Sequence, residues 1–133
     1  MRFTVDRIDH VVLNCADVET SASWFQRVLG MEREEFGADR RTALKFGGQK
    51  INLRPVDADA EAWFTAGTAL PGTADLCFTT AVGWEDVIAH LHACGVTIEK
   101  GPVPKTGALG PITSVYCRDP DGNLIEIASY LRS

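Results

Sequence analysis

The chain has 133 residues, which is the size of one ordinary domain with a usable hydrophobic core. Its hydrophobic content of 45% is that of a soluble globular protein, and no apolar run approaches the roughly 18 residues of a membrane span. The formal net charge of −5 is spread along the chain without a basic cluster that could follow a phosphate backbone. We therefore expect a cytoplasmic protein that binds neither membranes nor nucleic acid, with its four scattered cysteines reduced.

The order of segments is repeated along the chain. A strand-like stretch with His10 is followed by a helix-like stretch that ends at Gly30, and the same order recurs with Asp75 and Gly95. His10 and Asp75 are 65 positions apart, and so are Gly30 and Gly95. A shared offset across strand, helix and helix end predicts a duplicated supersecondary unit.

The first copy begins with a strand over residues 7–14, in which alternation places His10 on one face and Leu13 on the other. Asp17 is the expected N-cap of a helix that ends at Gly30. Turn-forming residues then separate three further strands, at residues 31–36, 41–46 and 50–56.

Residues 57–72 break the pattern and predict a connection, which we expect Trp63 and Phe64 to pack against the core. The second copy predicts a strand over 74–80 and a helix over 84–93. Strands are then expected at 96–100, 112–118 and 124–130. The Gly- and Pro-rich stretch 101–111 predicts a long loop that could cover a site.

Three features occur together in this chain: two β-α-β-β-β modules, His10 early in the first of them, and the ending Asp119-Pro-Asp-Gly-Asn-Leu-Ile-Glu126. In these features the chain resembles the vicinal oxygen chelate superfamily (glyoxalase, bleomycin resistance protein, extradiol dioxygenase). The resemblance implies an α+β fold in which two tandem βαβββ modules form a curled mixed β-sheet cup with flanking helices. It implies one glyoxalase-like domain over 1–133, with module one at about 5–56, a connection at 57–72 and module two at about 73–131.

In this family, metal ligands come from the first and last strands of each module. The corresponding positions here are His10, Asn52, Asp75 and Glu126. An imidazole and two carboxylates suit one divalent ion such as Fe, Mn, Ni or Zn, so the resemblance implies His10, Asp75 and Glu126 as its ligands. It further implies Glu126 as the catalytic acid–base group and expected substrate-binding roles for Asn52, Arg54, Lys105 and Tyr116.

Several functions stay open at this point. A metal-dependent lyase or isomerase acting on a small oxygen-rich metabolite is favoured over an extradiol dioxygenase, because no His follows Gly107 in that group's signature. A phosphonate-handling thiol transferase would need a clustered basic pocket. A metal-free protein that sequesters a drug or metabolite is the main alternative, and Asp75 could instead be a residue that caps the preceding turn. The family also implies a homodimer, with each site formed within one chain or across two.

Overall fold

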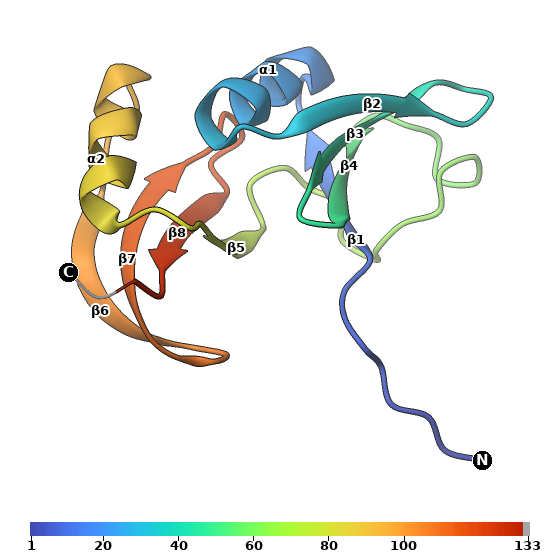
Figure 1. The fold of residues 1–133 in the computed structure, drawn as a ribbon. Coiled ribbons are helices and arrows are strands. Elements are labelled where there is room, and N and C mark those ends of the chain that lie inside the picture. Colours follow the sequence, from blue (N-terminus) through green and yellow to red (C-terminus); the bar gives the residue numbers. More distant parts are fainter. Residues whose placement is uncertain (132–133) are drawn as a thin grey trace. The chain divides into compact units, whose positions relative to one another are not determined.

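The computed structural model describes residues 1–131, and the chain divides into two compact units, Met1–Leu70 and Pro71–Ser133. The first unit consists of β1 (His10–Cys15), α1 (Val18–Leu29), β2 (Glu32–Phe36), β3 (Arg41–Phe46) and β4 (Gln49–Pro55). Its four strands form one mixed sheet in the order β1-β4-β3-β2, with β1 parallel to β4 and the other pairs antiparallel (Figure 1).

The second unit repeats this architecture. It consists of β5 (Asp75–Thr79), α2 (Trp84–Ala93), β6 (Lys100–Gly107), β7 (Gly110–Arg118) and β8 (Leu124–Ser129). The sheet order is β5-β8-β7-β6, again with the first and last strands of the unit parallel and adjacent. The predicted α+β fold of two βαβββ modules is therefore confirmed.

The register of the two sheets is also equivalent. Val12 of β1 lies opposite Asn52 of β4, and Cys77 of β5 lies opposite Glu126 of β8. Since Val12 and Cys77 are related by the same 65-residue offset as His10 and Asp75, Asn52 occupies in the first unit the place of Glu126 in the second. The alignment inferred from sequence thus holds at the level of strand register.

In each unit one helix covers one face of the sheet (Figure 1). The Asp17 side chain caps α1 by accepting a hydrogen bond from the Thr20 amide at 3.1 Å, and Gly30 ends the helix with a positive φ of 67°. The apolar side of α1 packs on the apolar sheet face, which forms a dry core with Phe25, Leu44, Ile51 and Leu53 almost completely buried. The alternating residues of β1 and β4, including Asn52, therefore belong to the sheet face without a helix.

The prediction of a long loop at 101–111 and of a strand at 96–100 is wrong. Residues 100–107 form β6, which pairs with β7 through a short turn. Proline is tolerated there because β6 is the edge strand, where Pro102 and Pro104 need not donate a hydrogen bond to a further neighbour. This segment forms part of the sheet, so it is not a loop that covers a site.

The connection after β4 is held in place by Arg41 of the first unit. Arg41 stacks over the Trp63 ring at 4.0 Å from the centroid and donates to the Ala62 carbonyl at 2.9 Å. The expectation for Phe64 is wrong, because its side chain is 91% exposed.

Among residues 1–131, no helix is long and apolar enough to cross a membrane. That the two units form a single domain with the module limits given above stays a prediction.

Candidate functional site

The second unit gathers polar side chains around Glu126 on the sheet face opposite α2. Cys77, Glu126 and Tyr116 form a row across the adjacent strands β5, β8 and β7. The Ser114 hydroxyl donates to Glu126 Oε2 at 2.5 Å, and Tyr116 and Cys77 lie opposite Glu126 on the two neighbouring strands. We call these four residues the Glu126 cluster. Because none of the three neighbours is a cation, the carboxylate is oriented without being neutralised.

Both titratable neighbours of Glu126 resist ionisation. Cys77 is exposed as a whole, but partial desolvation of its thiol, reinforced by the negative charge of Glu126, raises the pKa of the thiol to about 11. Burial and the same carboxylate also raise the pKa of the Tyr116 phenol. At neutral pH both groups therefore remain protonated, and the Cys77 thiol is not an activated nucleophile.

His10 lies at the start of β1 in the first unit, with its side chain 45% exposed. Its Nδ1 is 2.9 Å from Asp9 Oδ2. An ionised carboxylate can only accept a hydrogen bond, so Nδ1 is the nitrogen that donates to Asp9 and Nε2 is the nitrogen left for a metal. A carboxylate on one ring nitrogen with the other left open is the arrangement in which histidines bind metals.

Asp75 is the exposed first residue of β5, two positions before Cys77 on the same face. Within the described residues 1–131, no group of three or more His, Cys, Asp or Glu side chains lies close enough to hold a metal ion. The predicted ligands His10, Asp75 and Glu126 belong to different units, so neither unit contains the complete set. Their donor chemistry fits a divalent ion, with one oriented imidazole and two carboxylates.

Asn52 and Arg54 lie on β4, on the helix-free face of the first unit. Both are buried, at 8% and 2% exposure. Arg54 donates to Asn14 Oδ1 at 2.8 Å and to the Ala58 carbonyl at 3.0 Å. In the described part of the chain, Arg54 Nε and Asn52 Oδ1 are buried atoms without a hydrogen-bond partner.

The remaining predicted substrate residue, Lys105, is exposed on β6 opposite Ile112. It lies two residues along the strand from Val103, which is opposite Ser114. The substrate-binding roles of Lys105 and Tyr116 stay predictions.

Sequence reasoning missed Ser114 and Cys77. Ser114 is completely buried and is the closest donor to Glu126. Alternation from Asp75 places Cys77 on the polar face, and this signal was present in the sequence. The contact of Ser114 with Glu126 depends on the pairing of β7 with β8, which no local pattern specifies.

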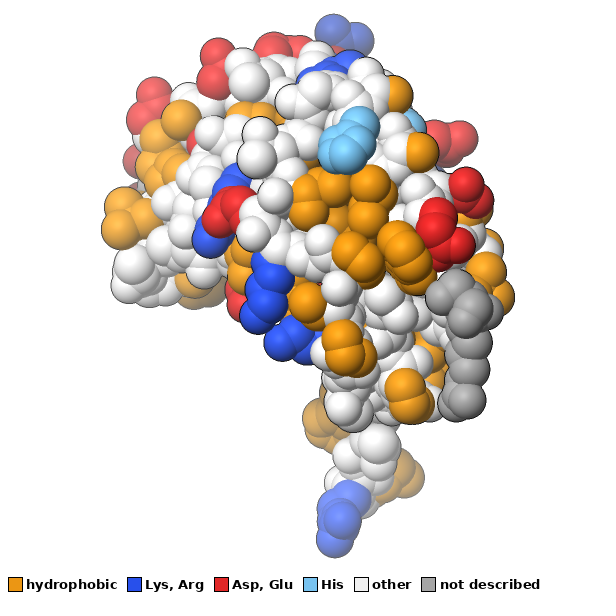
Figure 2. All heavy atoms as spheres, turned by 90° about the vertical axis from the view of Figure 1, so that its left-hand side faces the viewer, with side chains coloured by type: hydrophobic (Ala, Val, Ile, Leu, Met, Phe, Trp, Pro, Cys, Tyr) orange, Lys and Arg blue, Asp and Glu red, His pale blue; other side chains and the backbone are white. Residues whose placement is uncertain are grey.

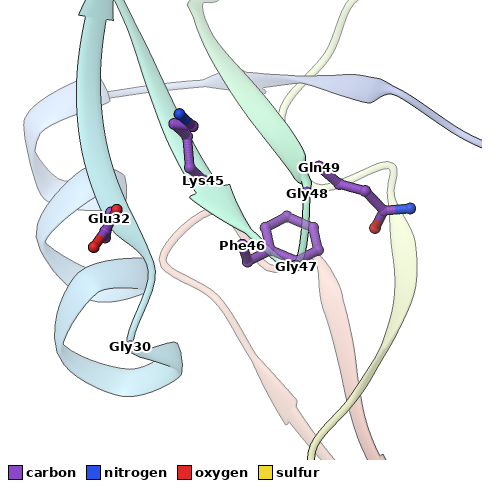
Figure 3. A pocket seen from close by; sticks show the side chains of 7 residues that line it. All are labelled: Gly30, Glu32, Lys45, Phe46, Gly47, Gly48 and Gln49. Carbon is purple, nitrogen blue, oxygen red and sulfur yellow. The ribbon is translucent and has the colours of Figure 1, made fainter.

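Two hollows of the first unit lie apart from these residues. The larger, with a volume of about 520 Å³, lies at the turn between β3 and β4 (Figure 3). It is lined by Gly30, Glu32, Lys45, Phe46, Gly47, Gly48 and Gln49. The smaller, of about 240 Å³, lies beside Trp63. Neither is lined by a predicted site residue, so neither supports the predicted chemistry.

The other two histidines lie on α2 and are exposed. Figure 2 shows a histidine at the surface beside hydrophobic side chains. His90 Nε2 is 3.5 Å from Cys94 Sγ, one helical turn further on. Neither His90 nor His92 belongs to the sheet face that carries Glu126.

Two β-α-β-β-β modules with equivalent register, each with polar residues at matching places on its first and last strands, define a glyoxalase-like protein. The chain belongs to the Glyoxalase/Bleomycin resistance protein/Dioxygenase superfamily, whose family model matches residues 7–127. It is 44% identical to "Virulence protein STM3117" of Salmonella typhimurium over 131 residues, covering 98% of this chain and 89% of that protein. It is 43% identical to "Glyoxalase domain-containing protein RDO1" of Mycosarcoma maydis, over 97% of this chain and 71% of that protein.

Solved structures agree with this assignment. An integron cassette protein from V. cholerae superposes with a TM-score of 0.93 at 46% identity, covering 98% of this chain and all of that one. A lactoylglutathione lyase from Agrobacterium tumefaciens and the antibiotic-binding protein TnmS3 from a Streptomyces species superpose with TM-scores of 0.73 and 0.74. They cover 96% of this chain and 96% and 98% of their own, and at 20% and 19% identity they show the shared fold alone.

Proposed function

We propose that the protein is a divalent-metal-dependent lyase or isomerase that acts on a small oxygen-rich metabolite. The observation that carries this proposal is the Glu126 cluster, in which Ser114 orients a half-buried carboxylate that lies between Cys77 and Tyr116 on the last strand of the second module. Relatives of this family place a metal-binding or proton-moving group at that strand. The cluster supports the same use of Glu126 here.

In this proposal His10 Nε2, Asp75 and Glu126 hold the metal, from one chain or from two chains of a homodimer. When bound, the ion would supply Lewis-acid polarisation of substrate oxygens. Ser114 fixes Oε2 of Glu126, which limits rotation of the carboxylate while it exchanges a proton with a substrate carbon. Asp9 fixes the tautomer and orientation of His10.

The alternative is a metal-free protein that sequesters a small molecule. The feature that favours it is Asn52, since a neutral amide replaces a possible carboxylate ligand at the place equivalent to Glu126. TnmS3, which shares the fold, is an antibiotic-binding protein.

Metal analysis of protein purified without chelator separates the two functions. The wild type, His10→Ala and Glu126→Ala would be compared, with His92→Ala and Glu85→Ala as surface controls. We expect about one equivalent of metal in the wild type and controls, and loss of metal from both site variants. The wild type would also be dialysed against each of Fe, Mn, Ni and Zn. If it still contains no metal but holds a small molecule, the proposed enzyme is refuted and the sequestering function is supported.

A further inference from the structure

Arg54 differs in one respect from the other cations of the described chain. It is the only buried lysine or arginine among residues 1–131, at 2% exposure, and it forms no ion pair there. Arg33, Arg40, Arg41, Lys45 and Arg118, which are all more exposed, each have a carboxylate partner. The least hydrated guanidinium therefore lacks the counter-ion that its burial requires.

The hydrogen bonds of Arg54 do not remove this need. Its two terminal nitrogens donate to the neutral oxygens of Asn14 and Ala58, while Nε is buried without an acceptor. Five N–H donors on a fixed planar fork match the two oxygens of a carboxylate or phosphate. The unpaired Nε donor and the unbalanced charge both call for an anion.

A second unpartnered atom lies beside it. Asn52 Oδ1 is buried without a donor, and it belongs to the same face of β4 two residues away. Same-face positions on a strand are about 6.6 Å apart. A ligand that satisfies both residues would therefore carry an oxyanion for Arg54 and a nearby hydroxyl that donates to Asn52.

From these observations we infer that Arg54 and Asn52 form an oxyanion subsite, which binds a small hydroxylated acid bearing a carboxylate or a phosphate. This inference rests on the proposed function for its biological meaning, because it names the substrate class of the same protein. It does not depend on the metal, since both residues lie in the first unit and neither is a predicted metal ligand.

Thermal unfolding of the full chain in EDTA tests the subsite with two probes, sodium phosphate and sodium lactate. Sodium chloride at the same ionic strength serves as the reference, since it reproduces screening but not oxyanion geometry. We expect at least one probe to raise the Tm by about 3–6 °C at ten times its Kd. The probe that gives the larger rise identifies the group as phosphate or carboxylate.

Arg54→Met keeps much of the side-chain volume and removes the charge, so its Tm should not respond to either probe. Arg40→Met, at an exposed arginine of the same unit, is the matched control and should respond as the wild type does. If Arg54→Met fails to fold, Asn52→Asp provides the same test, because its carboxylate would pair with Arg54 and abolish the response.

Two results would overturn the subsite. One is a wild type whose Tm in phosphate and in lactate equals its Tm in chloride. The other is an undiminished response in Arg54→Met or, if that variant does not fold, in Asn52→Asp. A wild type that contains no metal but responds to the probes would refute the proposed enzyme and leave the subsite standing, so the two failures are distinguishable.

Discussion

The turn before β8 provides the sharpest test of how the second unit is stabilised. Asp119 is 5% exposed, and its Oδ1 accepts hydrogen bonds from the amides of Asp121 and Asn123 at 3.0 and 2.9 Å. Its Oδ2 accepts from Asn123 Nδ2 at 2.7 Å. Asn123, 2% exposed, in turn accepts from the Ala74 amide at 2.9 Å through Oδ1. The turn thus connects the start of β5 to the start of β8, the two strands that carry Asp75 and Glu126.

Asp119→Ala would leave the amide and side-chain donors of Asn123 buried without an acceptor. At about 1–3 kcal/mol for each orphaned donor, less the relief of removing a buried carboxylate, the expected loss in unfolding free energy is about 2–4 kcal/mol. For a chain of this size the Tm falls by roughly 10 °C. The assay is urea unfolding followed by circular dichroism and by tryptophan fluorescence. A loss below about 0.5 kcal/mol would refute the reasoning.

Asp119→Asn is the matched variant, because its Oδ1 still accepts from both backbone amides. We expect a smaller loss than for alanine. Burial raises the pKa of the Asp119 carboxyl above its unfolded value, so the folded state binds the proton more tightly. The contribution of this group to unfolding free energy therefore falls as pH rises from the unfolded to the folded pKa, and stays low above it. The wild type minus Asp119→Asn difference should show this slope, and a difference independent of pH would contradict it.

Further predictions concern single residues. Gly72→Ala should lower the free energy of unfolding in urea by about 1–3 kcal/mol more than Gly95→Ala does. Both glycines have a positive φ, but of the two only Gly72 would place its new Cβ 2.6 Å from a backbone oxygen. Equal losses in the two variants would contradict this. Cys117 is completely buried, and burial raises the pKa of its thiol to about 11. It should therefore react with iodoacetamide at pH 8 only after urea unfolds the chain, which mass spectrometry would show. Rapid labelling of the folded protein would count against this burial. Asp17→Ala should lower the unfolding free energy by about 1 kcal/mol through loss of the α1 cap, and an unchanged midpoint in urea would exclude that role.

The sequence predicted most elements because local signals agreed with the tertiary context. The helix expected at 84–93 is α2 to the residue, and the 65-residue offset predicted two equivalent sheets. The strand β6 was missed because Pro102 and Pro104 are compatible with a strand only at a sheet edge, and edge position is decided by the pairing of distant segments.

The candidate site was predictable in part for a similar reason. Glu126 was found from the turn and strand that surround it, whereas Ser114 acts through an antiparallel pairing with β8 that only the folded chain fixes. The burial of Arg54 could not be predicted either, because arginine is among the residues least often buried. Its position two residues after Asn52 gave no indication that its charge would lack an acidic partner.

Asn52 on β4 and Glu126 on β8 occupy equivalent places in the two modules, and their surroundings explain why the two residues would differ in chemistry. On β8 a carboxylate lies beside neutral side chains, which leaves its charge available for a metal or a proton. A carboxylate at the Asn52 position would instead face Arg54, two residues away on the same side of the strand, and would neutralise it. Asparagine keeps the polarity of the position without that charge. In our two proposals, the amide at Asn52 is therefore what preserves Arg54 for an acidic substrate, while Glu126 retains the acid–base role.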